Sequence, residues 1–115
     1  MAASNCPAAS DEQFTKERFS GCVAIITGGA SGIGAATVKR FASDGATAVI
    51  FDINEKVGRE AATSLTSKGF QVEFVAVDVS DRDQCMQAVN AVAEKHGKVN
   101  FLVNGAVFFG SKGEQ

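Results

Sequence analysis

Glycines crowd a short segment near the start of this chain, between an apolar run and a helical pattern. Residues 27–34 read Thr-Gly-Gly-Ala-Ser-Gly-Ile-Gly, and the apolar run Val23 to Ile26 comes directly before them. Apolar residues then recur at three- and four-residue spacing, which places them on one side of a helix: Ala35, Val38, Phe41 and Ala42. The sequence therefore predicts a strand, a tight glycine turn and a helix that stops at Gly45.

The alternation of an apolar run and a helical pattern recurs twice more, and a fourth apolar run follows. The later runs are Ala48 to Phe51, Phe74 to Val77 and Phe101 to Val103. Strands that are nearly continuous in apolar residues are typical of parallel sheets covered by helices on both faces. We therefore predict an α/β fold with a Rossmann-type doubly wound parallel sheet, incomplete, with about four strands and three helices.

The two later helices have recognisable ends. Asn54 is the predicted N-cap of the second helix, which ends before Gly69, and Ser80 with Asp83 forms a capping-box pattern at the start of the third, which ends at Gly97. The second helix is expected to bury Val57, Ala61 and Leu65. The third carries the apolar stripe Cys85, Ala88, Val89, Val92 and Ala93, with His96 in its last turn.

Composition argues against several classes of partner. A net charge of -2 and a pI near 5.3 provide no basic field for nucleic acid or an anionic membrane, and no stretch approaches the ~20 apolar residues of a membrane span. The three cysteines, Cys6, Cys22 and Cys85, lack disulfide-framework or zinc-site spacing, which favours a reducing, cytoplasmic location and no metal. We expect residues 1–18 to be a disordered tail and residues 19–115 to form one partial domain.

The glycine turn is a candidate site for a diphosphate. Between a strand and a helix, backbone N–H groups and the helix N-terminus can receive phosphate oxygens, and glycine lets the backbone approach them. A nucleoside-triphosphate loop would need Lys and then Ser or Thr after the last glycine, but Ala35 and Ala36 follow Gly34. A purely structural turn that packs the helix against the strand remains the alternative.

Asp52 closes the second apolar run, 18 residues after Gly34. In dinucleotide folds a carboxylate about 20 residues beyond the glycines binds the adenosine ribose hydroxyls. The same charge would repel the 2′-phosphate of NADP, and no Arg or Lys lies in the loop or just after Asp52 to compensate. The cofactor we predict is NAD. Asp also ends strands for structural reasons, so a structural role stays open.

The segment from about Phe19 to Asn104 resembles the short-chain dehydrogenase/reductase family. Its Thr-Gly-x-x-x-Gly-x-Gly pattern is matched by Thr27, Gly28, Gly32 and Gly34, and its Asp-Val pair by Asp78 and Val79. Of its Asn-Asn-Ala-Gly segment, Asn104 and Ala106 match, whereas Gly105 and Val107 depart; Gly105 is expected to loosen the turn. The resemblance implies that NAD is bound by Thr27, Gly28, Ser31, Gly32, Ile33, Gly34, Asp52, Ile53, Asp78, Val79, Asn104 and Ala106.

The resemblance also implies hydride transfer between NAD(H) and an alcohol or carbonyl substrate, with a Ser and a Tyr-x-x-x-Lys segment. The chain contains no tyrosine, so we assign no catalytic residue. We predict the N-terminal part of an NAD-dependent short-chain oxidoreductase, inactive as a truncated chain, whose substrate binds only in a longer form. Its fourth strand would keep an open edge that favours self-association. The alternatives are a non-catalytic NAD-binding or partner-binding fragment and, less consistent with the glycine pattern, a methyltransferase.

Overall fold

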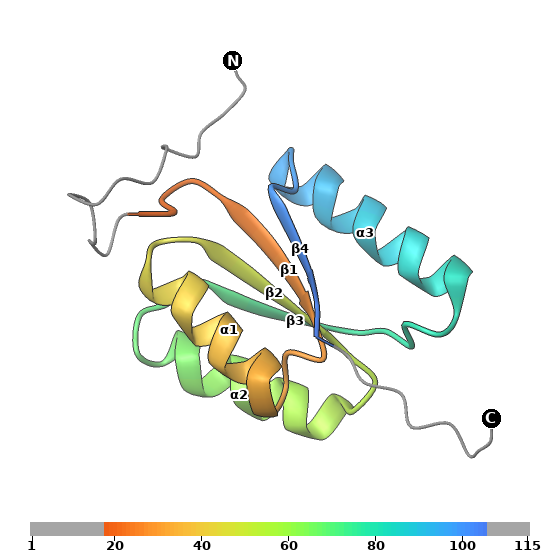
Figure 1. Ribbon diagram of the computed structural model, residues 1–115, viewed down its shortest axis with the longest axis horizontal. Helices are drawn as coiled ribbons and strands as arrows, with labels where there is room; N and C mark the ends of the chain where they lie inside the picture. The colour runs from red at the N-terminus through yellow and green to blue at the C-terminus, as the bar shows by residue number, and fades with distance from the viewer. Residues whose placement is uncertain (1–17, 106–115) are drawn as a thin grey trace.

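The computed structural model describes residues 18–105, which form a parallel sheet with helices on both faces (Figure 1). The four strands are β1 (Val23–Thr27), β2 (Thr47–Asp52), β3 (Val72–Ala76) and β4 (Phe101–Asn104). The three helices are α1 (Gly32–Ser43), α2 (Glu55–Thr66) and α3 (Arg82–His96). The predicted α/β fold, a partial Rossmann-type sheet, is thereby confirmed.

In the strand order β3-β2-β1-β4, successive strands are added on one side of β1 and then on its other side, although all four strands are parallel. The chain runs outward from β1 through β2 to β3, and then crosses back through α3 to β4 on the other side of β1. In Figure 1, α1 and α2 lie on one face of the sheet and α3 lies on the other. A sheet of this kind opens a crevice at the carboxyl ends of the strands where the order reverses, and the glycine turn lies at that end of β1.

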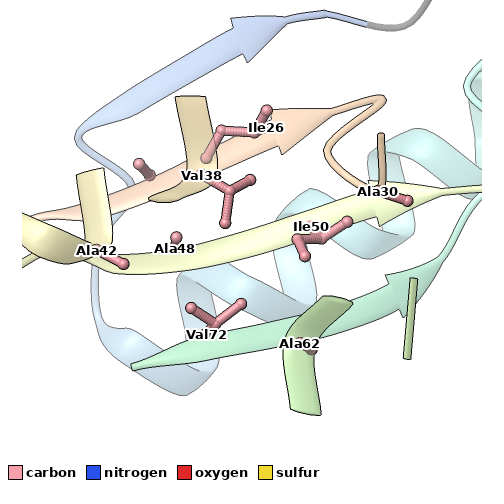
Figure 2. Packing of buried hydrophobic residues seen from close by; sticks show 9 residues of the cluster. Ile26, Ala30, Val38, Ala42, Ala48, Ile50, Ala62 and Val72 are labelled. Carbon is pink, nitrogen blue, oxygen red and sulfur yellow. The ribbon is translucent and has the colours of Figure 1, made fainter. Parts of the chain in front are cut away.

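Alternate residues of the strands supply two cores, one on each face. The core under α1 and α2 includes Ile26, Val38 and Ile50, which are fully buried and lie close together in Figure 2. The core under α3 includes Ile25, Phe51 and Val92. Neighbours such as Ile25 and Ile26 are buried on opposite faces, which explains why the strand sequences are nearly continuous in apolar residues.

The ends of the second helix are as predicted, but the start of the third is not. Asn54 caps α2, since its side chain accepts a hydrogen bond from Val57 N–H. The N-cap of α3 is Asp81 instead of Ser80, because the Asp81 carboxylate accepts hydrogen bonds from two first-turn N–H groups. The hydroxyl of Ser80 is engaged elsewhere, donating to Asp78 Oδ1 at 2.6 Å. Gly97 ends the helix as expected.

The charged end of α3 is fastened to the edge strand. His96 Nε2 lies 3.1 Å and Lys95 Nζ 3.2 Å from Glu73 Oε2 on β3. Partial burial raises the pKa of Glu73, but hydrogen bonds from His96 and then Lys95, with their charges, lower it more, so that it lies below its ordinary value of 4.5. The sequence places His96 in the last helical turn but gives no sign of this partner.

The two cysteines in the described part of the chain differ in their chemical state. Cys85 is a free, half-buried thiol on α3, whereas Cys22 is disulfide-bonded, contrary to the expected reduced state.

Among residues 18–105, no helix has the length and apolar character that a bilayer crossing demands. Within the same residues, no group of His, Cys, Asp or Glu side chains is arranged to hold a metal ion. The predicted tail lies almost entirely outside the described residues.

Candidate functional site

A cleft of about 540 Å³ lies at the carboxyl ends of β1, β2 and β4. Because the strands are parallel, the turns that follow them meet at one edge of the sheet. Most of the predicted site residues that come from the glycine turn contribute to this cleft, together with residues that follow β2 and β4. The lining consists of Gly28, Ser31, Gly32, Ile33, Gly34, Asp52, Asn104 and Gly105.

The glycine turn is held against β2 and folded tightly on itself. Gly28 has a φ of 70°, which favours glycine, and its N–H donates to the carbonyl oxygen of Phe51 at 2.8 Å. A Cβ at Gly34 would overlap the carbonyl oxygen of Gly28. The close approach of α1 to the turn therefore requires glycine at position 34, which gives the final glycine of the pattern a steric reason.

The first turn of α1 lines the cleft with Gly32, Gly34 and the exposed side chain of Ile33. Ser31 is the N-cap in an extended conformation, and its side chain makes no capping hydrogen bond. The first turn contains no acidic residue. The first amides of a helix have no acceptor within the helix, and the helix dipole makes this end attractive to an anion. The amides that follow Ser31 can thus donate to a bound phosphate group.

Asp52 lies across the cleft from the helix, half-buried at the end of β2. Its Oδ2 accepts a hydrogen bond from Ala30 N–H at 3.2 Å, and its Oδ1 accepts one from Asn54 N–H at 3.0 Å. A carboxylate has about four acceptor positions, so two backbone donors leave capacity for hydroxyl groups of a ligand. Among the described residues that line the cleft, Asp52 is also the one that carries a charge.

Thr27, the last residue of β1, is not among the residues that line the cleft, and it connects β1 to the end of β4. The residue is 5% exposed, its hydroxyl donates to the carbonyl oxygen of Val103 at 3.4 Å, and it accepts from Gly105 N–H at 3.0 Å. Gly105 N–H also lies 3.0 Å from the Thr27 carbonyl oxygen. Gly105, the first residue after β4, is therefore held by two acceptors, whereas the sequence led us to expect that it loosens the turn.

Of the remaining predicted residues, Ile53, Asp78 and Val79 are not among those that line the cleft. Ile53 is 69% exposed and Val79 is 39% exposed, and neither lines the cleft. Hydrogen bonds from the hydroxyl and amide of Ser80 hold Asp78 and lower its pKa. Ala106 lies outside the described residues. The assignment of all these residues to cofactor binding stays a prediction.

Two residues of the candidate site, Ala30 and Gly105, were not predicted from the sequence. Ala30 contributes only its backbone N–H, so its side-chain type gives no signal that it contacts Asp52. Gly105 lines the cleft where the family pattern has asparagine. A signal for Gly105 existed in its place directly after a strand, because residues there meet the other strand ends at the same edge of the sheet.

Comparison with known proteins agrees with the fold. The sequence profile of short chain dehydrogenases matches residues 22–114. The chain is 42% identical over 89 residues to 2,5-dichloro-2,5-cyclohexadiene-1,4-diol dehydrogenase LinX of Sphingobium indicum, covering 77% of this chain and 36% of that protein. It is 42% identical over 90 residues to (+)-borneol dehydrogenase 1 of Salvia officinalis, covering 78% of this chain and 34% of the other.

Solved structures give the same result. The structure of NAD⁺-bound xylitol dehydrogenase superposes with a TM-score of 0.75 at 31% identity, covering 79% of this chain and 35% of that one. A hydroxysteroid dehydrogenase from Escherichia coli superposes with a TM-score of 0.74, also at 31% identity, covering 77% of this chain and 38% of that one.

The parallel sheet with a glycine turn at its reversal point defines a Rossmann-type α/β protein. More narrowly, the chain belongs to the short-chain dehydrogenase family of oxidoreductases. It spans about a third of the length of the relatives described above.

Proposed function

We propose that this chain forms the NAD-binding part of an oxidoreductase that moves a hydride between NAD(H) and an alcohol or carbonyl substrate. The observation that carries the proposal is the meeting of Asp52 with the glycine turn in one cleft, where Ala30 N–H donates to the Asp52 carboxylate. A glycine turn alone fits a structural role. A carboxylate with free acceptor capacity opposite a helix N-terminus fits a ribose joined to a diphosphate.

The residues of the cleft suit the parts of a dinucleotide. The first amides of α1 would hold the diphosphate, and the absence of a Cβ at Gly34 lets α1 lie against the carbonyl oxygen of Gly28 in the glycine turn. Asp52 would accept hydrogen bonds from the adenosine ribose, while Asn104 and Gly105 lie at the β4 side of the same cleft. When bound, the nicotinamide accepts or donates the hydride.

Preference for NAD over NADP follows from the charge of the cleft. Asp52 is the one charged residue of the described lining, so no Arg or Lys of that lining would neutralise a 2′-phosphate. A phosphate beside an ionised carboxylate is repelled, most strongly where water is partly excluded. The superposed xylitol dehydrogenase has NAD⁺ bound, which supports the same cofactor here.

The substrate class comes from the relatives. By their names, one acts on a cyclohexadiene diol and another on borneol, and both are called dehydrogenases. An alcohol that is oxidised to a carbonyl is common to these names. We extend that reaction class to the longer protein that this chain would belong to.

A second candidate function is favoured by the absence of tyrosine from all 115 residues. A positioned general acid or base contributes about 10² to 10⁴ to a rate. In this alternative the chain is a non-catalytic module that binds NAD or pairs with another protein through the edge of β4 that pairs with no strand among residues 18–105. Both candidate functions predict that a polypeptide of these 115 residues does not catalyse the oxidation of an alcohol by NAD.

Calorimetric titration of the chain with NAD and with NADP tests the proposal. We expect NAD to bind with a dissociation constant below about 1 mM, and NADP to bind at least about tenfold more weakly. NADH formation with a panel of secondary alcohols, followed at 340 nm, should stay at the level of the protein-free control. Equal affinity for the two cofactors would overturn the assignment of Asp52, and turnover would overturn the assigned lack of catalysis.

A further inference from the structure

The side chain of Asp52 joins two segments of backbone. Oδ2 accepts from Ala30 N–H in the glycine turn, and Oδ1 accepts from Asn54 N–H at the start of α2. Ala30 lies 22 residues away along the chain, so this hydrogen bond is a tertiary contact and no local turn. Hydrogen bonds to an ionised acceptor are roughly twice as strong as neutral ones. Asp52 is therefore placed to fix the turn relative to α2.

A second hydrogen bond attaches the turn to β2. Gly28 N–H donates to the Phe51 carbonyl oxygen at 2.8 Å, one residue before Asp52. The turn is thus held at residues 28 and 30, directly before the segment Ser31 to Gly34 that lines the cleft. Ala30 is 8% exposed, and because its N–H donates to Asp52 Oδ2 it is not available to a ligand. The amides left for an anionic ligand are those of the first turn of α1.

From this geometry we propose that Asp52 is a positioning residue for the glycine turn, in addition to contacting the ribose. Its carboxylate holds Ala30, and through Ala30 it sets the place of the amides from Ser31 to Gly34 that receive the diphosphate. The inference rests on the proposed function, because the diphosphate is that of the proposed cofactor. It adds that the ribose and diphosphate subsites are coupled through one side chain.

Two ligands separate the two roles. ADP carries both the diphosphate and the ribose hydroxyls, whereas 2′,3′-dideoxy-ADP keeps the diphosphate and lacks the hydroxyls. If Asp52 acted only on the ribose, replacing it would weaken ADP and leave dideoxy-ADP unchanged. If it also positions the turn, its replacement weakens dideoxy-ADP as well.

The experiment measures the affinities of both ligands for the chain and for Asp52→Ala and Asp52→Asn. We expect Asp52→Ala to weaken dideoxy-ADP at least about fivefold and ADP by a larger factor. Asp52→Asn keeps the side-chain volume and one carbonyl acceptor, so its effect should be smaller. Asp81→Asn is the matched control, because Asp81 also accepts two backbone N–H groups but lies at the start of α3 and does not line the cleft.

Each outcome decides between the claims. No binding of ADP by the wild-type chain would sink the proposed function itself. A loss for ADP with unchanged dideoxy-ADP would overturn the positioning role and leave the ribose contact standing. Equal losses for both ligands would support positioning and overturn the ribose contact.

Folding of each variant is checked by thermal unfolding and circular dichroism. The amide resonance of Ala30 in a ¹⁵N correlation spectrum gives a readout besides affinity. It should move in both Asp52 variants and stay fixed in Asp81→Asn, whereas an unmoved Ala30 resonance would contradict the tether.

Discussion

Asp52 supplies the negative charge of the cleft, and glycines supply the space around it. The two features depend on different physical effects, namely hydrogen bonding by an ionised acceptor and close approach of backbone. Both were recognisable from residue type and spacing. The glycines and Asp52 were therefore predictable from residue type and spacing, whereas Ser31, Ile33 and Asn104, which also line the cleft, were predicted through the family resemblance.

Replacing Gly34 by alanine should damage the cleft directly. The added methyl group would overlap the carbonyl oxygen of Gly28, which is backbone and cannot rotate away, so α1 must shift. We expect the free energy of unfolding to fall by about 1–3 kcal/mol and NAD affinity to fall as well. Urea denaturation and calorimetry measure the two effects. Ala36→Ser, on the exposed side of the same helix, should change neither, and an unaltered Gly34→Ala protein would contradict the steric argument.

Ile33 offers a test that separates binding from folding. It lines the cleft and is 85% exposed, so it contributes little to the core. Ile33→Ser should leave the free energy of unfolding within about 0.5 kcal/mol of the wild-type value and weaken NAD severalfold through lost apolar contact. Met86→Ser is the control, because it removes an apolar side chain from α3 that is also exposed, at 57%, and does not line the cleft. Should the two variants bind NAD alike, Ile33 has no part in the site.

Among the helices and strands, the elements themselves followed from period and composition. Apolar runs gave the strands, and three- and four-residue spacing gave the helices. The exact cap of α3 did not follow, because Ser80 and Asp81 are both good N-caps and the hydrogen bond of Ser80 to Asp78 decides between them. Glu73 and His96 are 23 residues apart in the sequence, and no local pattern encodes such a pair.

The attachment of α3 to β3 should depend on acidity. The pKa of Glu73 is lowered in the folded chain, so ionised Glu73 stabilises the fold above its unfolded pKa near 4.5. That contribution is lost as the pH falls below 4.5 and through the lower, folded pKa. Glu73→Gln cannot titrate, so the stability advantage of wild type over this variant should shrink as the pH falls from well above 4.5 to well below it. Urea denaturation across that range measures the difference.

The pairing partners limit how large this effect can be. Lys95 is 65% exposed at its side chain and Glu73 is 31% exposed, so solvent screens the interaction. Raising the salt concentration at neutral pH should reduce the advantage. A difference between wild type and Glu73→Gln that is constant with pH would contradict the lowered pKa.

For the molecule as a whole, β4 leaves one edge of the sheet open. β1 and β2 are flanked by strands, whereas β4 pairs only with β1 among residues 18–105, and Leu102 on it is 54% exposed. Free strand edges template association with other chains, and a lysine placed there opposes it. The parallel sheet was predictable from the βα alternation, but the strand order was not, because doubly wound sheets occur with more than one order.

We expect the 115-residue polypeptide to self-associate in a concentration-dependent way, and Leu102→Lys to reduce this. Sedimentation velocity at several concentrations gives the populations. Met86→Lys is the control, because it adds the same charge at an exposed position of α3. If the protein stays monomeric at all concentrations up to about 100 μM, the dissociation constant for self-association lies above about 100 μM. That result would contradict the role of the edge.

Mapping NAD onto the folded chain by ¹⁵N correlation spectra tests the central claim most directly. With increasing NAD, we predict progressive shifts at the amides of residues 28–34, at Asp52 to Asn54 and at Asn104 and Gly105, and no shifts in the last turns of α3. The charge-reversed variant Asp52→Lys should lose most of the response to NAD. Shifts that fall outside the cleft, or an undiminished response in Asp52→Lys, would contradict the account.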